Sequence, residues 1–172
     1  MKSIIMIMLS ALLMLGCTTK YPNQNPVGKA FPSVSGTALE GVKVNIPEEF
    51  EGRKVILLLG YVQDTQFDID RWLIGLDQTQ VKTNVYEIPT INSFWAGLFR
   101  EKIDEGMRRG IPKELWKVVI TVYDDGAKVQ EFTGNESPRN ARVLLLDEEG
   151  AIIFFYDRGF SVPALNELRQ AL

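Results

Sequence analysis

A short apolar run at residues 55–59 leads through a polar loop into a segment whose apolar residues follow helical spacing. The run is too short to cross a membrane and indicates a buried strand. The segment that follows carries one amphipathic stripe, made of Ile69, Trp72, Leu73 and Leu76. This pattern predicts the first strand–helix unit of an α/β domain. Because ligands of open α/β sheets collect at the carboxyl ends of such strands, residues 60–70 are the first place to look for function.

The polar residues at the start of this helix also have predicted roles. Asp64 or Thr65 is expected to cap the helix with a side-chain oxygen that accepts hydrogen bonds from the first free backbone amides. Asp68 falls off the apolar stripe, and its early position favours interaction with the positive helix end. Capping and solvated surface are therefore the expected roles of these carboxylates.

The alternation of strands and helices continues along the chain. The apolar and turn residues predict two short strands within 31–46, a strand at 84–91, a helix from 92–93 to 110, a strand at 118–123, a short helix at 128–132, hairpin strands at 141–147 and 151–156, and a closing helix capped by Ser161. The closing helix is expected to face the core with Val162, Leu165, Leu168 and Leu172.

This order predicts an α/β fold of thioredoxin-like plan: a central mixed β-sheet flanked by helices, with an N-terminal strand pair and a C-terminal hairpin plus helix. The segment GKAFPSVSGTALEG before KVILLLGY resembles the opening of the peroxiredoxin and redoxin group, and NARVLLLDEEGAIIFFYDRGF resembles the closing hairpin of that superfamily. Over most of residues 27–172 the chain resembles the thioredoxin-like family that includes the Atp10-type assembly factors of mitochondrial ATP synthase. The resemblance implies an assembly or chaperone-like role.

The N-terminus has the pattern of a processing signal. Lys2 is followed by about a dozen mostly apolar residues, and the run ends in Met14, Leu15, Gly16 and Cys17. This junction resembles the lipobox of bacterial lipoproteins, with an ordinary secretory signal as the alternative. We expect a signal peptide at 1–16, a palmitate-bearing Cys17 with a flexible tether over 17–27, and the thioredoxin-like domain over 28–172. Because Thr18 replaces the aspartate that marks inner-membrane retention, we expect the outer membrane, facing the periplasm.

Composition restricts the chemistry. The chain has a net charge of −3, one cysteine and no histidine. A mildly acidic chain without basic clusters argues against nucleic acid as a partner. The absence of histidine excludes a Ser-His-Asp triad and the usual metal cages, so we expect no metal and no cofactor.

The thioredoxin resemblance implies a reactive cysteine in the loop after the first long strand, where the helix end lowers its pKa. In this chain the loop reads Gln63, Asp64, Thr65, Gln66. Thiol-disulfide oxidoreductase and thiol peroxidase activities are therefore not expected. Four polar residues, Gln63, Asp64, Gln66 and Arg71, form the candidate site for a ligand or partner.

Bulky apolar residues gather on the predicted helix 92–110 and the loop after it: Phe94, Trp95, Leu98, Phe99, Ile111, Leu115 and Trp116. Core packing is one explanation. A partner-binding patch, with Trp95, Phe99 and Trp116 at its centre, is the other. The functional hypothesis is a membrane-anchored, redox-inactive binding or assembly module with an envelope protein as its partner. The alternative is a small-ligand-binding or non-redox catalytic domain that uses the polar loop after the central strand.

Overall fold

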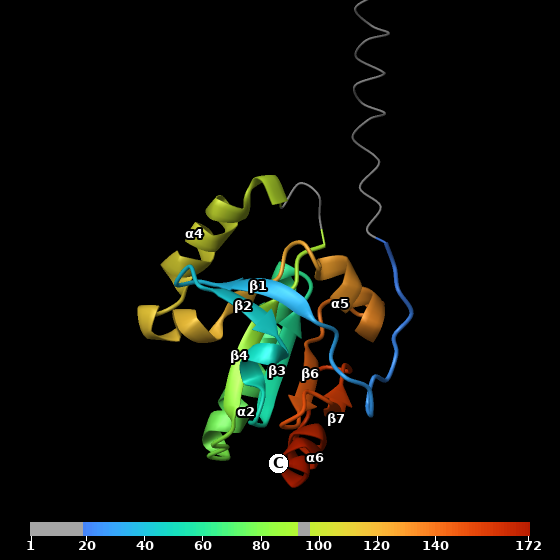
Figure 1. Cartoon of the computed structure of the whole chain (residues 1–172). Coiled ribbons are helices and arrows are strands. Elements are labelled where there is room, and N and C mark those ends of the chain that lie inside the picture. The colour runs from blue at the N-terminus through green and yellow to red at the C-terminus, as the bar shows by residue number, and fades with distance from the viewer. Residues whose placement is uncertain (1–18, 93–96) are drawn as a thin grey trace, which may run out of the picture.

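The computed structural model describes residues 19–92 and 97–172 (Figure 1). Its elements, in chain order, are β1 (Val34–Ala38), β2 (Lys43–Ile46), η1 (Glu48–Phe50), β3 (Val55–Gly60), η2 (Gln63–Thr65), α2 (Gln66–Gln78), β4 (Asn84–Pro89), α4 (Arg100–Gly110), η3 (Lys113–Val118), β5 (Ile120–Thr121), α5 (Gly126–Thr133), β6 (Arg142–Leu146), β7 (Ile152–Tyr156) and α6 (Val162–Ala171). No helix in these two ranges is long and apolar enough to cross a membrane.

The central sheet has the strand order β4-β3-β6-β7. Strand β3 pairs in parallel with β4 and antiparallel with β6, and β6 pairs antiparallel with β7, so the sheet is mixed. Residues 55–59 of β3 are all fully buried, because the strand is covered on both faces. This explains why the apolar run in the sequence is unbroken.

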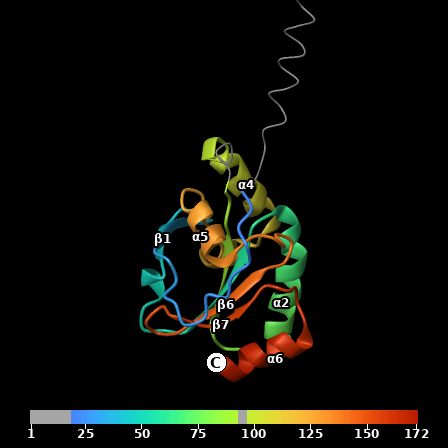
Figure 2. The same cartoon turned by 90° about the vertical axis from the view of Figure 1, so that its right-hand side faces the viewer.

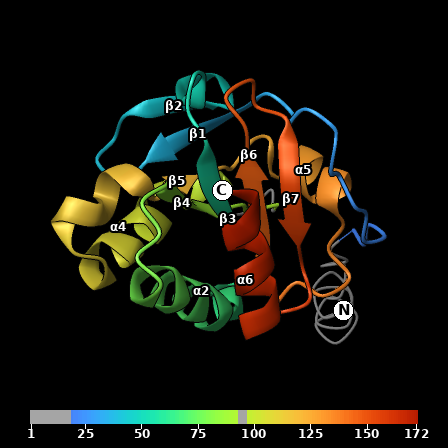
Figure 3. The same cartoon turned by 90° about the horizontal axis from the view of Figure 1, so that it is seen from below.

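Two different layers cover the two faces of this sheet (Figure 3). Ile56 and Leu58 pack with residues of α2 and α6, whereas Leu57 and Leu59 pack with the second sheet and with Val129 of α5. The second sheet has three strands in the order β2-β1-β5. The predicted mixed sheet with an N-terminal strand pair and a C-terminal hairpin plus helix is confirmed.

The predicted strand at 118–123 is shorter than expected. Within this segment only Ile120 and Thr121, which form β5, pair with β1, while Val119 and Val122 form isolated parallel bridges to Glu87 of β4 and to Thr90 just after it. The segment therefore leaves one sheet for the other within a few residues, and this transition interrupts regular pairing.

The buried side of α2 differs from the predicted stripe. Ile69, Trp72 and Leu76 are buried, but Leu73 is exposed and Asp68 is buried. With about 100° between successive residues, Leu73 falls just outside the buried arc and Asp68 inside it. The arc is shifted toward Gly75, where Leu165 and Phe160 approach so closely that a Cβ atom would lie 2.9 Å from Leu165 Cδ2.

Helix α6 begins as predicted, since the Ser161 hydroxyl accepts a hydrogen bond from the backbone N–H of Ala164 at 3.3 Å. Leu165 and Leu168 are buried and Leu172 packs against the same cluster. The prediction for Val162 is wrong, because its side chain is 60% exposed. Val162 lies in the first helical turn, ahead of the residues of α6 that contact the sheet.

Helix α4 decides between the two explanations for the bulky apolar residues before and along it. None of its residues is buried, and Leu98 and Phe99 just before it are exposed. The core-packing explanation is therefore wrong for these two residues. The predicted helix start and Trp95 lie outside the described residues.

The described part of the predicted tether is not free of packing partners. We call residues 19–26 the N-terminal strap, because they run along the domain beside α5 (Figure 2). Tyr21 and Asn135 exchange hydrogen bonds at 2.8 and 3.0 Å, and Gln24 N–H donates to the Thr133 carbonyl at 3.2 Å. Gly134 makes this approach possible, since any Cβ atom there would collide with the backbone of Pro22 and Asn23.

Candidate functional site

Two loops meet at the carboxyl end of β3. Residues 61–67 lead from β3 into α2, and residues 134–141 precede β6; we call these two loops together the strand-end site. The Thr65 hydroxyl donates to the Pro138 carbonyl at 2.7 Å. Asp64 and Arg139 form an exposed ion pair at 3.3 Å. Side-chain contacts therefore join the two loops. The segment predicted for function, residues 60–70, lies at this junction.

The four candidate ligand residues, Gln63, Asp64, Gln66 and Arg71, are all exposed around this site. They do not form one cluster. Asp64 is paired with Arg139, whereas Gln66 donates to Asp70 at 2.9 Å and to Glu87 at 3.5 Å. Arg71 forms no ion pair with a carboxylate of residues 19–92 or 97–172. The four residues therefore give the strand-end site an exposed polar edge.

The predicted helix cap is wrong. Thr65 stands at the N-cap of α2, but no side chain caps the helix. The Thr65 hydroxyl instead accepts from the Val62 N–H at 3.3 Å while it donates to Pro138. The short 3-10 turn η2 changes the direction of the chain before α2, so the hydroxyl faces the loop and not the helix amides.

Two exposed apolar residues, Val62 and Phe67, flank Gln63 to Gln66 in the sequence. Val62 is 44% exposed and Phe67, in the first turn of α2, is 71% exposed. Sequence reasoning missed Phe67, although its place outside the apolar stripe was a visible signal. A large aromatic ring held in solvent on a rigid helix is typical of a binding surface.

Asp68 lies directly behind the exposed part of the site. Its carboxylate is buried and accepts two backbone N–H groups, from Ala141 at 2.9 Å and from Phe160 at 2.7 Å. The expected solvated role is therefore wrong. Asp68 joins α2 to the start of β6 and to the loop before α6, which fixes the helix relative to loop 134–141.

Arg142 forms the floor of the site and is fully buried. Its guanidinium donates to three loop carbonyls, those of Gly134, Ser137 and Asn140, at 3.2, 2.6 and 2.8 Å. A fourth bond reaches Asn23 Oδ1 of the strap at 3.3 Å. No carboxylate of the described ranges pairs with it, and burial lowers its pKa. Arg142 therefore organises loop 134–141 through backbone oxygens.

Tyr61 completes this floor. The Arg142 guanidinium lies over the Tyr61 ring at 4.8 Å from its centroid. The Tyr61 and Thr133 hydroxyl groups form a hydrogen bond with each other. Burial raises the pKa of Tyr61 to about 12. The phenol is therefore neutral at physiological pH. Tyr61 and Arg142 support the loops of the site from below.

A separate cavity of about 300 Å³ lies between the strap and the end of β7. It is lined by Asn23, Gln24, Asn25, Phe155, Tyr156, Asp157 and Arg158. None of residues 61–67 lines it, so it is not part of the strand-end site.

Comparison with known proteins identifies the fold. No known family profile matches the chain, and no curated protein matches its sequence. Solved structures do match. The thioredoxin domain of a thiol-disulfide oxidoreductase from Bacteroides vulgatus has a TM-score of 0.55 at 18% identity, over 86% of this chain and 98% of that one. This chain has a thioredoxin-like fold.

Two further structures of the same fold are similar over nearly their whole length. The exposed lipoprotein thioredoxin of Streptococcus pneumoniae has a TM-score of 0.54 at 13% identity, over 82% of this chain and 100% of that one. A thiol peroxidase from Chromobacterium violaceum has a TM-score of 0.57 at 14% identity, over 88% and 90%. At these identities the likeness shows the fold alone.

No group of three potential metal ligands is present among the described residues.

The candidate partner patch lies at a different place from the strand-end site. Phe99 is 51% exposed, whereas Trp116 is half-buried and donates its indole N–H to the Ile111 carbonyl at 2.9 Å. Trp95 and Cys17 lie outside the described residues, so the patch is described only in part.

Replacing Glu87 by glutamine is expected to stabilise the domain at neutral pH. Burial and the nearby charge of Asp70 raise the pKa of Glu87 on β4, against a hydrogen bond from Gln66 that lowers it. The folded state favours the protonated carboxyl, so this stability is present at acidic pH and is lost as pH rises through the raised pKa. Urea unfolding of Glu87→Gln should show a gain at neutral pH that disappears at acidic pH. An equal gain at both would contradict the titration, and Glu167→Gln, exposed on α6, is the control.

Proposed function

We propose that the chain is a membrane-anchored, redox-inactive thioredoxin-like binding or assembly module of the bacterial cell envelope. One observation carries the proposal. The loop that would hold a reactive cysteine reads Gln63 to Gln66, and the exposed apolar residues Val62 and Phe67 stand beside it. The strand-end site lies where thioredoxin-like enzymes bind their substrates, but it has no thiol to react with them.

The anchor is the second part of the proposal. The Gly16–Cys17 junction after an apolar run supports lipidation of Cys17, and the outer membrane facing the periplasm is the proposed location. Labelled palmitate should enter the wild-type protein and not Cys17→Ser. Label that persists in Cys17→Ser would overturn the anchor.

The rigidity of the strand-end site supports a binding role. The contacts Thr65–Pro138 and Asp64–Arg139 hold the two loops together. A preorganised surface loses little conformational entropy when a partner binds. Phe67 is an exposed apolar side chain that follows the exposed polar residues Gln63, Asp64 and Gln66, and an apolar centre with a polar rim is the usual composition of an interface. The partner we propose is an extended segment of another envelope protein.

Crosslinking in intact cells tests this proposal. A photoreactive residue at Gln66 should capture one recurrent envelope protein, and a probe at Val162, exposed on α6, should not capture it. A third probe at Trp116 reports on the candidate partner patch. No recurrent protein at Gln66 would overturn the binding module, and screening of small molecules against the strand-end residues would then test the ligand alternative.

Phe67→Ser should abolish capture at Gln66 with little loss of stability. Phe67 is 71% exposed, so its removal is expected to change the free energy of unfolding by no more than about 0.5 kcal/mol. Ile74→Ser is the matched control, because Ile74 is 56% exposed on the same helix. Capture that survives Phe67→Ser, or that is lost equally in Ile74→Ser, would contradict the assigned surface.

A further inference from the structure

Exposed apolar residues at the start of α4 form a second surface that the strand-end site does not explain. Leu98 is 64% exposed and Phe99 is 51% exposed. The ammonium group of Lys102 lies 5.8 Å from the centroid of the Phe99 ring. These side chains expose apolar area beside positive charge.

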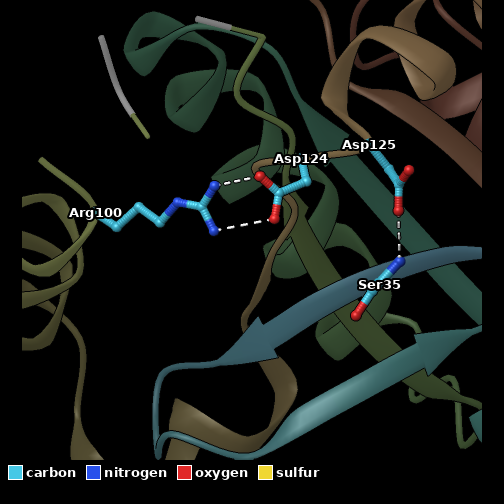
Figure 4. Close-up of polar contacts among 4 residues, drawn as sticks. All are labelled: Ser35, Arg100, Asp124 and Asp125. Atoms are coloured by element: carbon cyan, nitrogen blue, oxygen red, sulfur yellow. Dashed lines mark hydrogen bonds and ion pairs between the residues drawn. The ribbon is translucent and has the colours of Figure 1, made fainter. Parts of the chain in front are cut away.

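Polar contacts hold helix α4, and with it this surface, in place on the domain (Figure 4). Arg100 forms a two-point ion pair with Asp124, with Nη1 at 3.1 Å from Oδ2, and the next residue, Asp125, accepts from the Ser35 N–H of β1 at 2.9 Å. Farther along α4, the Arg108 Nε–H donates to the Leu39 carbonyl at 2.7 Å. The helix is therefore held at two points, and Leu98 and Phe99 project from a fixed end.

The strap leads to the same end of the molecule. In Figures 1 and 2 the start of α4 and the beginning of the strap, drawn in blue, both lie toward the end of the molecule opposite α6. Asn135 holds this end of the strap, because its side chain accepts from Tyr21 N–H at 2.8 Å and donates to the Thr19 carbonyl at 2.9 Å. Thr19 is thus attached to the domain.

The length of the connection to the anchor is short. Cys17 precedes Thr19 by two residues, which span at most about 7 Å. A lipid on Cys17 would therefore hold the top of the domain at the bilayer surface. This step depends on the anchor in the proposed function.

We infer that Leu98 and Phe99 form a second membrane contact, in which they enter the headgroup region of the bilayer that holds the lipid of Cys17. Arg100 is paired with Asp124, and the ammonium group of Lys102 lies beside the Phe99 ring. Exposed Leu and Phe side chains next to a lysine match the boundary between the headgroups and the acyl chains of a bilayer. The strand-end site on the domain then has a fixed orientation above the membrane.

The test uses the full-length lipidated protein in vesicles of phosphatidylethanolamine and phosphatidylglycerol. Lipidation consumes the Cys17 thiol, so Phe99→Cys provides one site for an environment-sensitive fluorophore. Its emission should shift to the blue and be quenched by spin labels on the lipid acyl chains. The matched control is Val162→Cys, since Val162 is 60% exposed and is the first residue of α6, which lies at the opposite end of the molecule. Its emission should not change on reconstitution.

A third variant tests the role of the strap. Asn135→Ala removes the two side-chain hydrogen bonds, from the Tyr21 N–H and to the Thr19 carbonyl, so the blue shift at position 99 should decrease while the protein still floats with the vesicles. Flotation with an unshifted label at position 99 would overturn the membrane contact and leave the anchor intact. Absence of flotation, with fluorophore attached to wild-type Cys17, would overturn the anchor and the membrane contact with it. A recurrent protein captured at Trp116 together with an unshifted label would assign the surface to a protein partner.

Discussion

Arg142→Leu should lower the free energy of unfolding by about 3 kcal/mol, since it removes the guanidinium donors from three carbonyls of loop 134–141, among them that of the buried Gly134. Arg142 is fully buried and satisfies the carbonyls of Gly134, Ser137 and Asn140. Leucine fills part of the volume and supplies no hydrogen bond. Urea denaturation of the purified protein measures the loss.

Two comparisons make this prediction specific. Arg139→Leu removes an exposed pair with Asp64 and should cost less than about 1 kcal/mol. Arg142→Lys keeps the charge but has only one nitrogen, so its loss should lie between those of the other two variants. A loss in Arg142→Leu no larger than that in Arg139→Leu would show that the buried guanidinium does not organise the loop.

The consequence for binding follows from the same contacts. Loop 134–141 forms one side of the strand-end site, and Arg142 also holds Asn23 of the strap. Folded Arg142→Leu protein should therefore capture less partner at Gln66 than Arg139→Leu does. The comparison separates positioning of the loop from direct contact with the partner.

Asp68→Ala is expected to cost about 3 kcal/mol, because two backbone N–H groups lose a charged acceptor. The carboxylate accepts from Ala141 at 2.9 Å and from Phe160 at 2.7 Å, and these residues belong to different segments. Alanine leaves both amides unpaired at a buried position. The loss is measured by urea denaturation, as for Arg142.

Two variants serve as controls for Asp68→Ala: a conservative substitution at the same position and an alanine substitution at Asp70. Asp68→Asn retains one carbonyl oxygen and should lose about half as much as Asp68→Ala. Asp70→Ala removes an exposed carboxylate that contacts Gln66 and should change stability by no more than about 0.5 kcal/mol. Equal losses in Asp68→Ala and Asp70→Ala would contradict the structural role of Asp68.

The two predictions concern residues that support the proposed site from behind. Arg142 holds one loop and Asp68 holds the helix that carries the other, while Phe67 and Val62 remain exposed in front. This division explains how exposed apolar residues can keep a fixed position without packing into the core. The same principle applies at the top of the molecule, where Arg100 and Arg108 hold α4 and leave Leu98 and Phe99 exposed.

The sequence by itself determined the order of the elements and the fold class. An unbroken apolar run, a helical stripe and a Ser161 cap are local signals, because each depends on residues within one or two turns or on one strand. The central strand, the hairpin and the closing helix were therefore predicted close to their observed ranges. The departure at Gln63 to Gln66 from a cysteine-bearing loop was equally visible in the sequence.

Only the tertiary structure decided which polar residues are buried and which apolar residues are exposed. Asp68 and Arg142 have no local partner, and their hydrogen bonds join segments that meet only after the chain has folded. The strap depends on close approach to Gly134, which no periodicity reveals. The exposed end of α4 depends on Arg100 and Asp124, 24 residues apart. Contacts at long range in sequence have no pattern of their own, so the site and its supports required the folded chain.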